Sequence, residues 1–144
     1  MAITTEELRA VSLLESIDKR ELRKLAAQLH EHRYPAGHTI VQEGKGGVGF
    51  FLVLDGTAVV SIRGEERGRL GPGNTFGELA LLDMHADRVA TVVAATDMRC
   101  AGMTAWEFRP FVMGHPEVAW TMLTTVAQRL RAAEERAVAP AAAG

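Results

Sequence analysis

Residues 76 to 92 read FGELALLDMHADRVATV, and the interpretation of the whole sequence starts from this stretch. It follows a glycine-rich turn at 70–75 (LGPGNT), and the residues after Gly77 form a predicted helical turn that is too short to pack against a core. Because Gly77 has no side chain, the backbone N–H groups of Gly77, Glu78, Leu79 and Ala80 can converge on an anion, assisted by the partial positive charge of a helix start. The stretch therefore predicts a phosphate site.

Two charged residues refine this prediction. Glu78 would repel a phosphate unless its carboxylate accepts hydrogen bonds from another part of the same ligand, and a ribose hydroxyl is a suitable donor. Arg88 stands ten residues later, at the entry to an apolar segment. Its guanidinium can pair with the phosphate, with about 1.5–3 kcal/mol for each charge-assisted bond. Acceptor, backbone donors and arginine together indicate a sugar phosphate.

Short apolar or alternating segments surround this stretch, and glycines separate them. They lie at 38–42, 49–54, 57–63, 68–70, 89–95 and 98–103. Many short strands joined by turns that can adopt positive φ are typical of an antiparallel jelly roll or barrel.

Helices are predicted on both sides of the strands. Thr4 can cap a first helix, and Asp18 can cap a second that should end near Arg33. Thr104 can cap a third, which the sequence GHP at 114–116 separates from a last helix ending near Arg136. We expect one domain at 1–136, with helices at 1–33, strands at 34–103 and C-terminal helices at 104–136, followed by a flexible tail at 137–144.

The sequences FGELAL at 76–81 and RVATV at 88–92 together resemble the ligand cassette of cyclic-nucleotide-binding domains. This family is known from cAMP-dependent kinase regulatory subunits, cyclic-nucleotide-gated channels and the bacterial catabolite activator. The resemblance covers residues 8 to 136 and includes YPAGHTI at 34–40. It implies a mainly β fold with flanking helices, namely an eight-stranded antiparallel β-roll of jelly-roll type with N-terminal helices and a C-terminal lid helix.

The resemblance also assigns roles within the cassette. Glu78 would hold the ribose 2′-hydroxyl, Arg88 would pair with the cyclic phosphate, and the backbone from Gly77 to Ala80 would surround that phosphate. Val89 and Ala90 would complete the ligand-binding residues. Valine at position 89 has no hydroxyl, and a serine or threonine there commonly favours cGMP in this family. We therefore expect cAMP as the ligand, with cGMP as the other candidate.

The last helix would close over the base, with Arg129, Leu130 and Ala133 as lid residues. The base-contacting Thr-Ser pair of the catabolite activator falls on Ala133 and Glu134 of this chain. Domains of this family make and break no bonds, so we expect a sensor that is not an enzyme and needs no cofactor besides its ligand. Binding would move the C-terminal helices. The alternative is a degenerate domain that serves as a ligand-free interaction or scaffold module.

Composition limits the partners. A net charge of −2 gives no basic face for a nucleic acid, and eight residues of the sequence follow Arg136. We therefore expect no direct nucleic-acid binding and no DNA-binding helix-turn-helix after the last helix. The apolar stripe of the last helix would allow a homodimer or an unidentified effector protein to bind. His30, His32 and His38 lack the further convergent ligands that a metal site needs, so none is expected.

Three further expectations come from residue types. Cys100 is the single cysteine and cannot form an internal disulfide, which favours a reducing compartment. No apolar segment approaches the roughly 20 residues of a membrane helix, and the N-terminus does not resemble an export signal. These features predict a cytoplasmic protein with no membrane contact. Trp106, Phe108 and Phe111 have helical spacing, so they are expected in the core.

Overall fold

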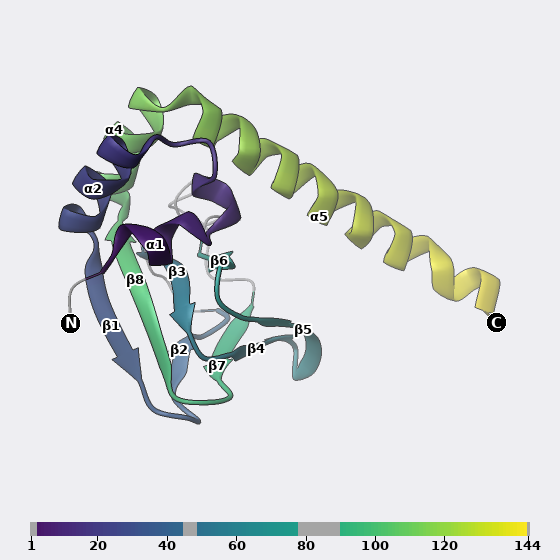
Figure 1. Cartoon of the computed structure of the whole chain (residues 1–144). Helices are drawn as coiled ribbons and strands as arrows, with labels where there is room; N and C mark the ends of the chain where they lie inside the picture. The colour runs from purple at the N-terminus through teal and green to yellow at the C-terminus, as the bar shows by residue number, and fades with distance from the viewer. Residues whose placement is uncertain (1–2, 45–48, 78–89, 144) are drawn as a thin grey trace.

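The computed structural model describes residues 3–44, 49–77 and 90–143. Within these ranges, eight strands form two four-stranded antiparallel sheets (Figure 1). One sheet has the order β1-β8-β3-β6 and the other β2-β7-β4-β5. The strands are β1 (His30–Tyr34), β2 (Thr39–Val41), β3 (Gly49–Asp55), β4 (Ala58–Ile62), β5 (Glu65–Leu70), β6 (Thr75–Phe76), β7 (Thr91–Ala94) and β8 (Met98–Thr104). The predicted antiparallel β-roll with flanking helices is confirmed.

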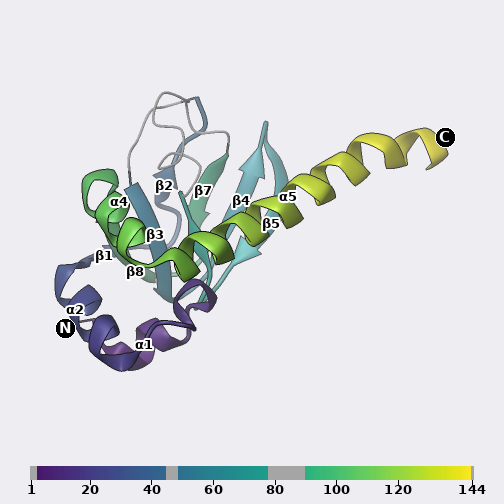
Figure 2. The same cartoon turned by 90° about the horizontal axis from the view of Figure 1, so that it is seen from above.

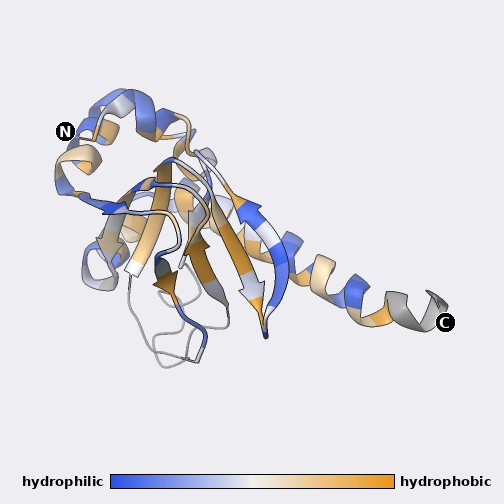
Figure 3. Cartoon of the chain, turned by 90° about the horizontal axis from the view of Figure 1, so that it is seen from below, coloured by the Kyte–Doolittle hydropathy of each residue, from blue (hydrophilic) through white to orange (hydrophobic). Residues whose placement is uncertain are grey.

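An inner strand and an edge strand of the roll differ in burial and polarity. Strand β8 lies between β1 and β3, and its first six residues are all buried. Strand β5 is at an edge, reads EERGRL and is mostly exposed, and Figure 3 shows it as a hydrophilic strand. Charged edge strands hinder pairing with other chains, so β5 is a protected edge.

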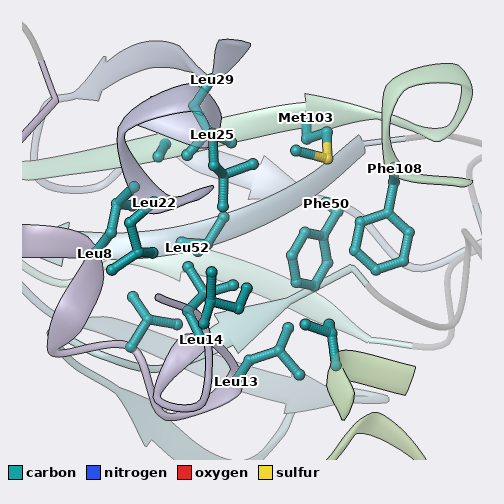
Figure 4. Close-up of a cluster of buried hydrophobic side chains, with 14 of the residues drawn as sticks. Leu8, Leu13, Leu14, Leu22, Leu25, Leu29, Phe50, Leu52, Met103 and Phe108 are labelled. Carbon is teal, nitrogen blue, oxygen red and sulfur yellow. The ribbon is translucent and has the colours of Figure 1, made fainter. Parts of the chain in front are cut away.

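The N-terminal helices cover one side of the first sheet. They are α1 (Thr5–Arg9), the 3-10 helix η1 (Ser12–Leu14) and α2 (Lys19–Gln28). Thr4 caps α1 through a capping box with Glu7, and Asp18 caps α2, as their residue types predict. Figure 4 shows the leucines of these helices meeting Phe50 of β3 and Phe108 in one apolar cluster.

Two helices follow the roll, α4 (Ala105–Gly114) and α5 (Pro116–Ala143). Thr104 and Glu107 form the capping box of α4, and the chain turns at His115 into α5. Near its start, α5 packs through Val118 and Met122, which belong to the apolar cluster. Figures 1 and 2 both show the C-terminal half of α5 extending away from the roll.

Several sequence-based boundaries were wrong. Helix α2 ends at Gln28 instead of near Arg33, because residues 30–34 pair with β8 as strand β1. Strand β6 lies where a turn was expected, and it pairs with β3. Helix α5 continues beyond Arg136 to Ala143, through a segment rich in alanine, the best helix former. Trp106 is 75% exposed instead of buried in the core.

A buried ion network connects α1 to the first sheet. Arg99 on β8 is 8% exposed, and its guanidinium pairs with Glu7 of α1 and with Glu31 of β1, the latter at Nε–Oε2 2.5 Å. The hydrogen bonds that Arg99 donates to these carboxylates raise the pKa of its guanidinium. The network joins three segments that are far apart in the sequence, so it fixes the N-terminal helix on the roll.

Candidate functional site

The described residues before the cassette form a tightly defined turn. The N–H of Gly73 donates to the carbonyl of Val53 (3.0 Å), the N–H of Val53 donates to the carbonyl of Asn74 (2.9 Å), and the Asn74 side chain accepts from Gly71 N–H (2.8 Å). Gly73 has φ +93°, and a Cβ there would lie 2.6 Å from the carbonyl oxygen of Ala10. Both features require glycine, and they fix where β6 begins.

Strand β6 leads to Gly77. Phe76 is 6% exposed and stacks on Phe51 with ring centroids 5.0 Å apart, so its backbone is held in place. Gly77 is half-buried and has φ +92°, in the left-handed region that favours glycine. The residue predicted to start the phosphate site therefore has a backbone conformation that favours glycine.

The cassette ends in the other sheet. Ala90 is half-buried and leads into β7, whose Thr91 hydroxyl accepts a hydrogen bond from Glu43 N–H (3.1 Å). The Glu43 carboxylate in turn accepts from Arg63 N–H in the β4–β5 turn (3.0 and 3.2 Å). The segment between Gly77 and Ala90 thus links an edge strand of one sheet to an inner strand of the other.

A cavity of about 120 Å³ lies between α5 and the roll. Its apolar lining comes from Leu13, Phe50, Leu70 and Met122, and its polar lining from Ser12, Asn74, Thr75, Thr125 and Arg129. Leu70 and Thr75 flank the glycine turn that precedes Gly77. The space under α5 therefore adjoins the beginning of the cassette.

Arg129 is the predicted lid residue that lies at this cavity. Partial burial lowers the pKa of its guanidinium, while the residue as a whole is exposed. The guanidinium stays charged, because arginine does not lose its proton in proteins. Thr125 precedes it by one helical turn and lines the same cavity. The structure thus brings a cation and a hydroxyl of α5 to the start of the cassette.

The other predicted site residues divide into two groups. Leu130 is 57% exposed and Ala133 is also exposed, and neither lines the cavity. Glu78, Leu79, Ala80, Arg88 and Val89 lie outside the described residues. Their roles stay predictions that rest on the sequence resemblance.

Sequence reasoning missed several residues around this site. Thr125 could have been found from its spacing to Arg129, because residues four apart share one helix face. No local signal marks Ser12 or Asn74 as cavity residues, because contacts across the fold bring them to α5. The Glu43–Arg63 contact likewise joins residues 20 positions apart.

Within the described residues, no helix is long and apolar enough to cross a membrane. The same residues contain no group of three or more histidine, cysteine, aspartate or glutamate side chains placed to hold a metal ion.

A relative found by sequence aligns with most of the chain. A CRP-like cAMP-activated global transcriptional regulator from Mycobacterium tuberculosis (strain CDC 1551 / Oshkosh) is 26% identical over 132 residues, which cover 88% of this chain. This chain spans 58% of the length of that relative.

Solved structures share the fold. The structure described as "cAMP bound PfPKA-R (141-441)" superposes with a TM-score of 0.84 at 28% identity, over 92% of this chain and 46% of that one. The catabolite activator protein of Thermus thermophilus gives a TM-score of 0.77 at 29% identity, over 86% of this chain and 60% of that one. Residues 31–115 match the family described as "Cyclic nucleotide-binding domain". The chain therefore belongs to the cyclic-nucleotide-binding domain family.

Proposed function

We propose that this domain binds cAMP in the cassette between Gly77 and Ala90 and transmits binding to helix α5. One observation carries the proposal: the roll holds Gly77 at φ +92° at the end of β6, where the sequence FGELAL begins. Glycine in this conformation lets backbone N–H groups approach a phosphate closely. In this proposal Glu78 accepts from the ribose 2′-hydroxyl and Arg88 pairs with the cyclic phosphate.

The cavity under α5 supports the coupling to that helix. Arg129 and Thr125 approach the roll beside Thr75, two residues before Gly77. A ligand in the cassette would meet α5 through this region, and differential contacts with α5 would shift its position. In this proposal the output is a change in the surface that α5 presents, and the domain regulates a partner without catalysing a reaction. We place it in the cytoplasm, because its single cysteine is a buried free thiol.

The preference for cAMP rests on Val89, which cannot donate a hydroxyl hydrogen bond to a guanine base. A missing hydrogen bond costs roughly 0.5–1.5 kcal/mol, or up to about tenfold in affinity. Val89→Thr should therefore increase cGMP affinity more than cAMP affinity. Equal changes for the two ligands would contradict this account of selectivity.

The test is ligand-linked stability of protein first stripped of carried-over nucleotide. Ligand at 100 times its dissociation constant stabilises a folded protein by about 2.7 kcal/mol, so cAMP should raise the melting temperature by several degrees. Arg88→Ala should abolish the shift and Glu78→Ala should reduce it. Arg23→Ala, an exposed arginine on α2, is the matched control and should leave the shift unchanged. A full shift in Arg88→Ala would refute the assigned phosphate contact, whereas no shift in the wild type would favour the ligand-free scaffold.

We also propose that α5 pairs two copies of the chain. Trp120, Leu123 and Leu130 are 73%, 61% and 57% exposed, and with Ala127 they follow the 3-4-3 spacing of a coiled-coil seam. Sedimentation should give a concentration-dependent dimer that Leu123→Lys/Leu130→Lys converts to a monomer. Met113→Lys changes a residue of α4 that is 74% exposed and is the control. A monomeric wild type at high concentration would contradict the pairing.

A further inference from the structure

We infer that Glu43 is a positioning residue of the ligand site, and that it fixes the end of the second sheet where the cassette joins β7. The inference rests on the proposed function and deepens it, because it names a residue outside the cassette on which ligand affinity depends. Glu43 stands two residues after β2 and contacts both the start of β7 and the β4–β5 turn. The conformation of that turn, its contact with Glu43 and the pairing of β7 support this role.

The β4–β5 turn has an unfavourable backbone conformation. Ile62 and Glu65 are paired, and the two residues between them, Arg63 and Gly64, have φ +54° and +78°. Positive φ at both positions is the pattern of a type I′ turn, which usually has asparagine, aspartate or glycine at the first of them. Among the residues that the structure describes, Arg63 is the one non-glycine residue with positive φ. An arginine persists in this conformation only where its surroundings stabilise it.

Glu43 provides that stabilisation. Both oxygens of its carboxylate accept a hydrogen bond from the N–H of Arg63, at 3.0 and 3.2 Å. A hydrogen bond to a charged acceptor is stronger than one between neutral groups, so it favours the turn conformation that presents this N–H. The Arg63 residue is exposed, whereas Glu43 is half-buried. The carboxylate therefore acts on the backbone of the turn.

The same residue holds the start of β7. The N–H of Glu43 donates to the Thr91 hydroxyl (3.1 Å). Thr91 also pairs with Ser61 of β4, which lies two residues before the turn. Figure 2 shows β2, β7 and β4 side by side, so Thr91 is held from both neighbouring strands. A turn that relaxed to negative φ would splay the ends of β4 and β5 and disturb this pairing.

This end of the sheet is where the cassette ends. Arg88, the proposed phosphate ligand, stands three residues before Thr91 in the sequence. Gly77, at the other end of the cassette, follows Phe76, which is held in the first sheet by its stacking on Phe51. A ligand that contacts both ends of the cassette requires a fixed spacing between them. Fixing one end before binding removes part of the ordering cost, so loss of the Glu43 contact should weaken binding by about three- to tenfold.

Hydrogen exchange in the ligand-free protein tests the structural part of the inference. Glu43→Ala should accelerate exchange of the β7 amides (Thr91–Ala94) by about tenfold more than that of the β8 amides (Met98–Thr104). Glu43→Ala/Arg63→Asn should restore the β7 rates, because the sequence Asn-Gly favours a type I′ turn by itself. Glu43→Ala/Arg63→Ala is the matched control. It removes the same arginine side chain but keeps the unfavourable positive φ, so it should not restore the rates.

Calorimetric titration with cAMP tests the same variants for the ligand site. Glu43→Ala should weaken binding by about three- to tenfold, and adding Arg63→Asn should restore the affinity whereas adding Arg63→Ala should not. A Glu43 that contacted the ligand directly would show no rescue by a change in the turn. Thr91→Val removes the acceptor of the Glu43 N–H and should also weaken binding. Thr91→Ser keeps the hydroxyl and should bind cAMP as the wild type does.

The outcomes separate this inference from the proposed function. Unchanged β7 exchange in Glu43→Ala, or equal recovery with Arg63→Asn and Arg63→Ala, would overturn the inference. Accelerated exchange with unchanged cAMP affinity in Glu43→Ala would also overturn it, because the contact would then serve only the stability of the sheet. Absence of cAMP binding by the wild type would refute the proposed function, and the ligand-free exchange rates would still decide whether Glu43 fixes the start of β7.

Discussion

Replacing Arg99 by methionine tests whether the buried ion network fixes the N-terminal helix on the roll. Methionine keeps much of the apolar stem and removes the charge. The Arg99 side chain is 10% exposed, whereas those of Glu7 and Glu31 keep 27% and 21% of their exposure. Charge-assisted bonds contribute about 1.5–3 kcal/mol each, and breaking a fully buried pair costs 3–5 kcal/mol. Because both carboxylates keep some water contact, we expect a loss of about 2–4 kcal/mol in the free energy of unfolding.

The pH dependence of this loss identifies its cause. Burial raises the pKa of Glu7, but hydrogen bonds from Arg99 and from Thr4 outweigh it, and the net shift is downward from 4.5. The Arg99 hydrogen bond likewise lowers the pKa of Glu31. A carboxyl with a lowered pKa in the folded state contributes stability that is present above its unfolded pKa and is lost as the pH falls through the folded value. The difference between wild type and Arg99→Met should therefore be full at pH 7 and shrink below about pH 4.5.

Urea denaturation of both proteins from pH 3 to pH 8 measures this difference directly. Arg33→Met is the matched control, because Arg33 also pairs with Glu31 but its side chain is 62% exposed, so its effect should be a small fraction of that of Arg99→Met. A difference between wild type and Arg99→Met that stays constant down to pH 3 would show that lost packing is responsible, and would refute the electrostatic account.

Two further changes test the turn before the cassette and the buried thiol. Gly73→Ala combines a positive φ with a Cβ 2.6 Å from the Ala10 carbonyl oxygen, so urea denaturation should show a loss of about 2–4 kcal/mol in the free energy of unfolding. Gly64→Ala, at φ +78° with open space around it, is the control and should lose about 1 kcal/mol. Equal losses would contradict the close approach at Gly73. Because burial raises the pKa of Cys100 to about 11, a thiol reagent at pH 8 should modify folded protein no faster than the protein unfolds, and rapid modification would show that the thiol is accessible.

The sequence was most informative where local chemistry decides the structure. Thr4, Asp18 and Thr104 each carry a side chain that accepts from a free N–H of the first helical turn, so three helix starts were predictable. Short apolar or alternating segments likewise predicted β3 and β8 with small errors at their ends. The resemblance of the cassette added the β-roll and the candidate ligand.

Other features depend on contacts between distant segments. Strand β1 reads HEHRY and has no apolar signal, and its extended conformation comes from pairing with β8, about 70 residues away. Arg99 meets partners 92 and 68 residues earlier in the chain, which no local pattern could reveal. The cavity beside Arg129 likewise forms from four separate parts of the chain. Such features follow from the assembled fold.

Calorimetric titration of nucleotide-stripped protein with cAMP tests the central proposal most directly. The account predicts one site per chain with micromolar affinity. It also predicts weaker binding of 2′-deoxy-cAMP, which lacks the hydroxyl assigned to Glu78, by roughly tenfold to a hundredfold for the loss of a hydrogen bond to a charged group. Equal affinity for the two ligands would contradict the assigned role of Glu78. No heat of binding at millimolar cAMP or cGMP would contradict the sensor function itself.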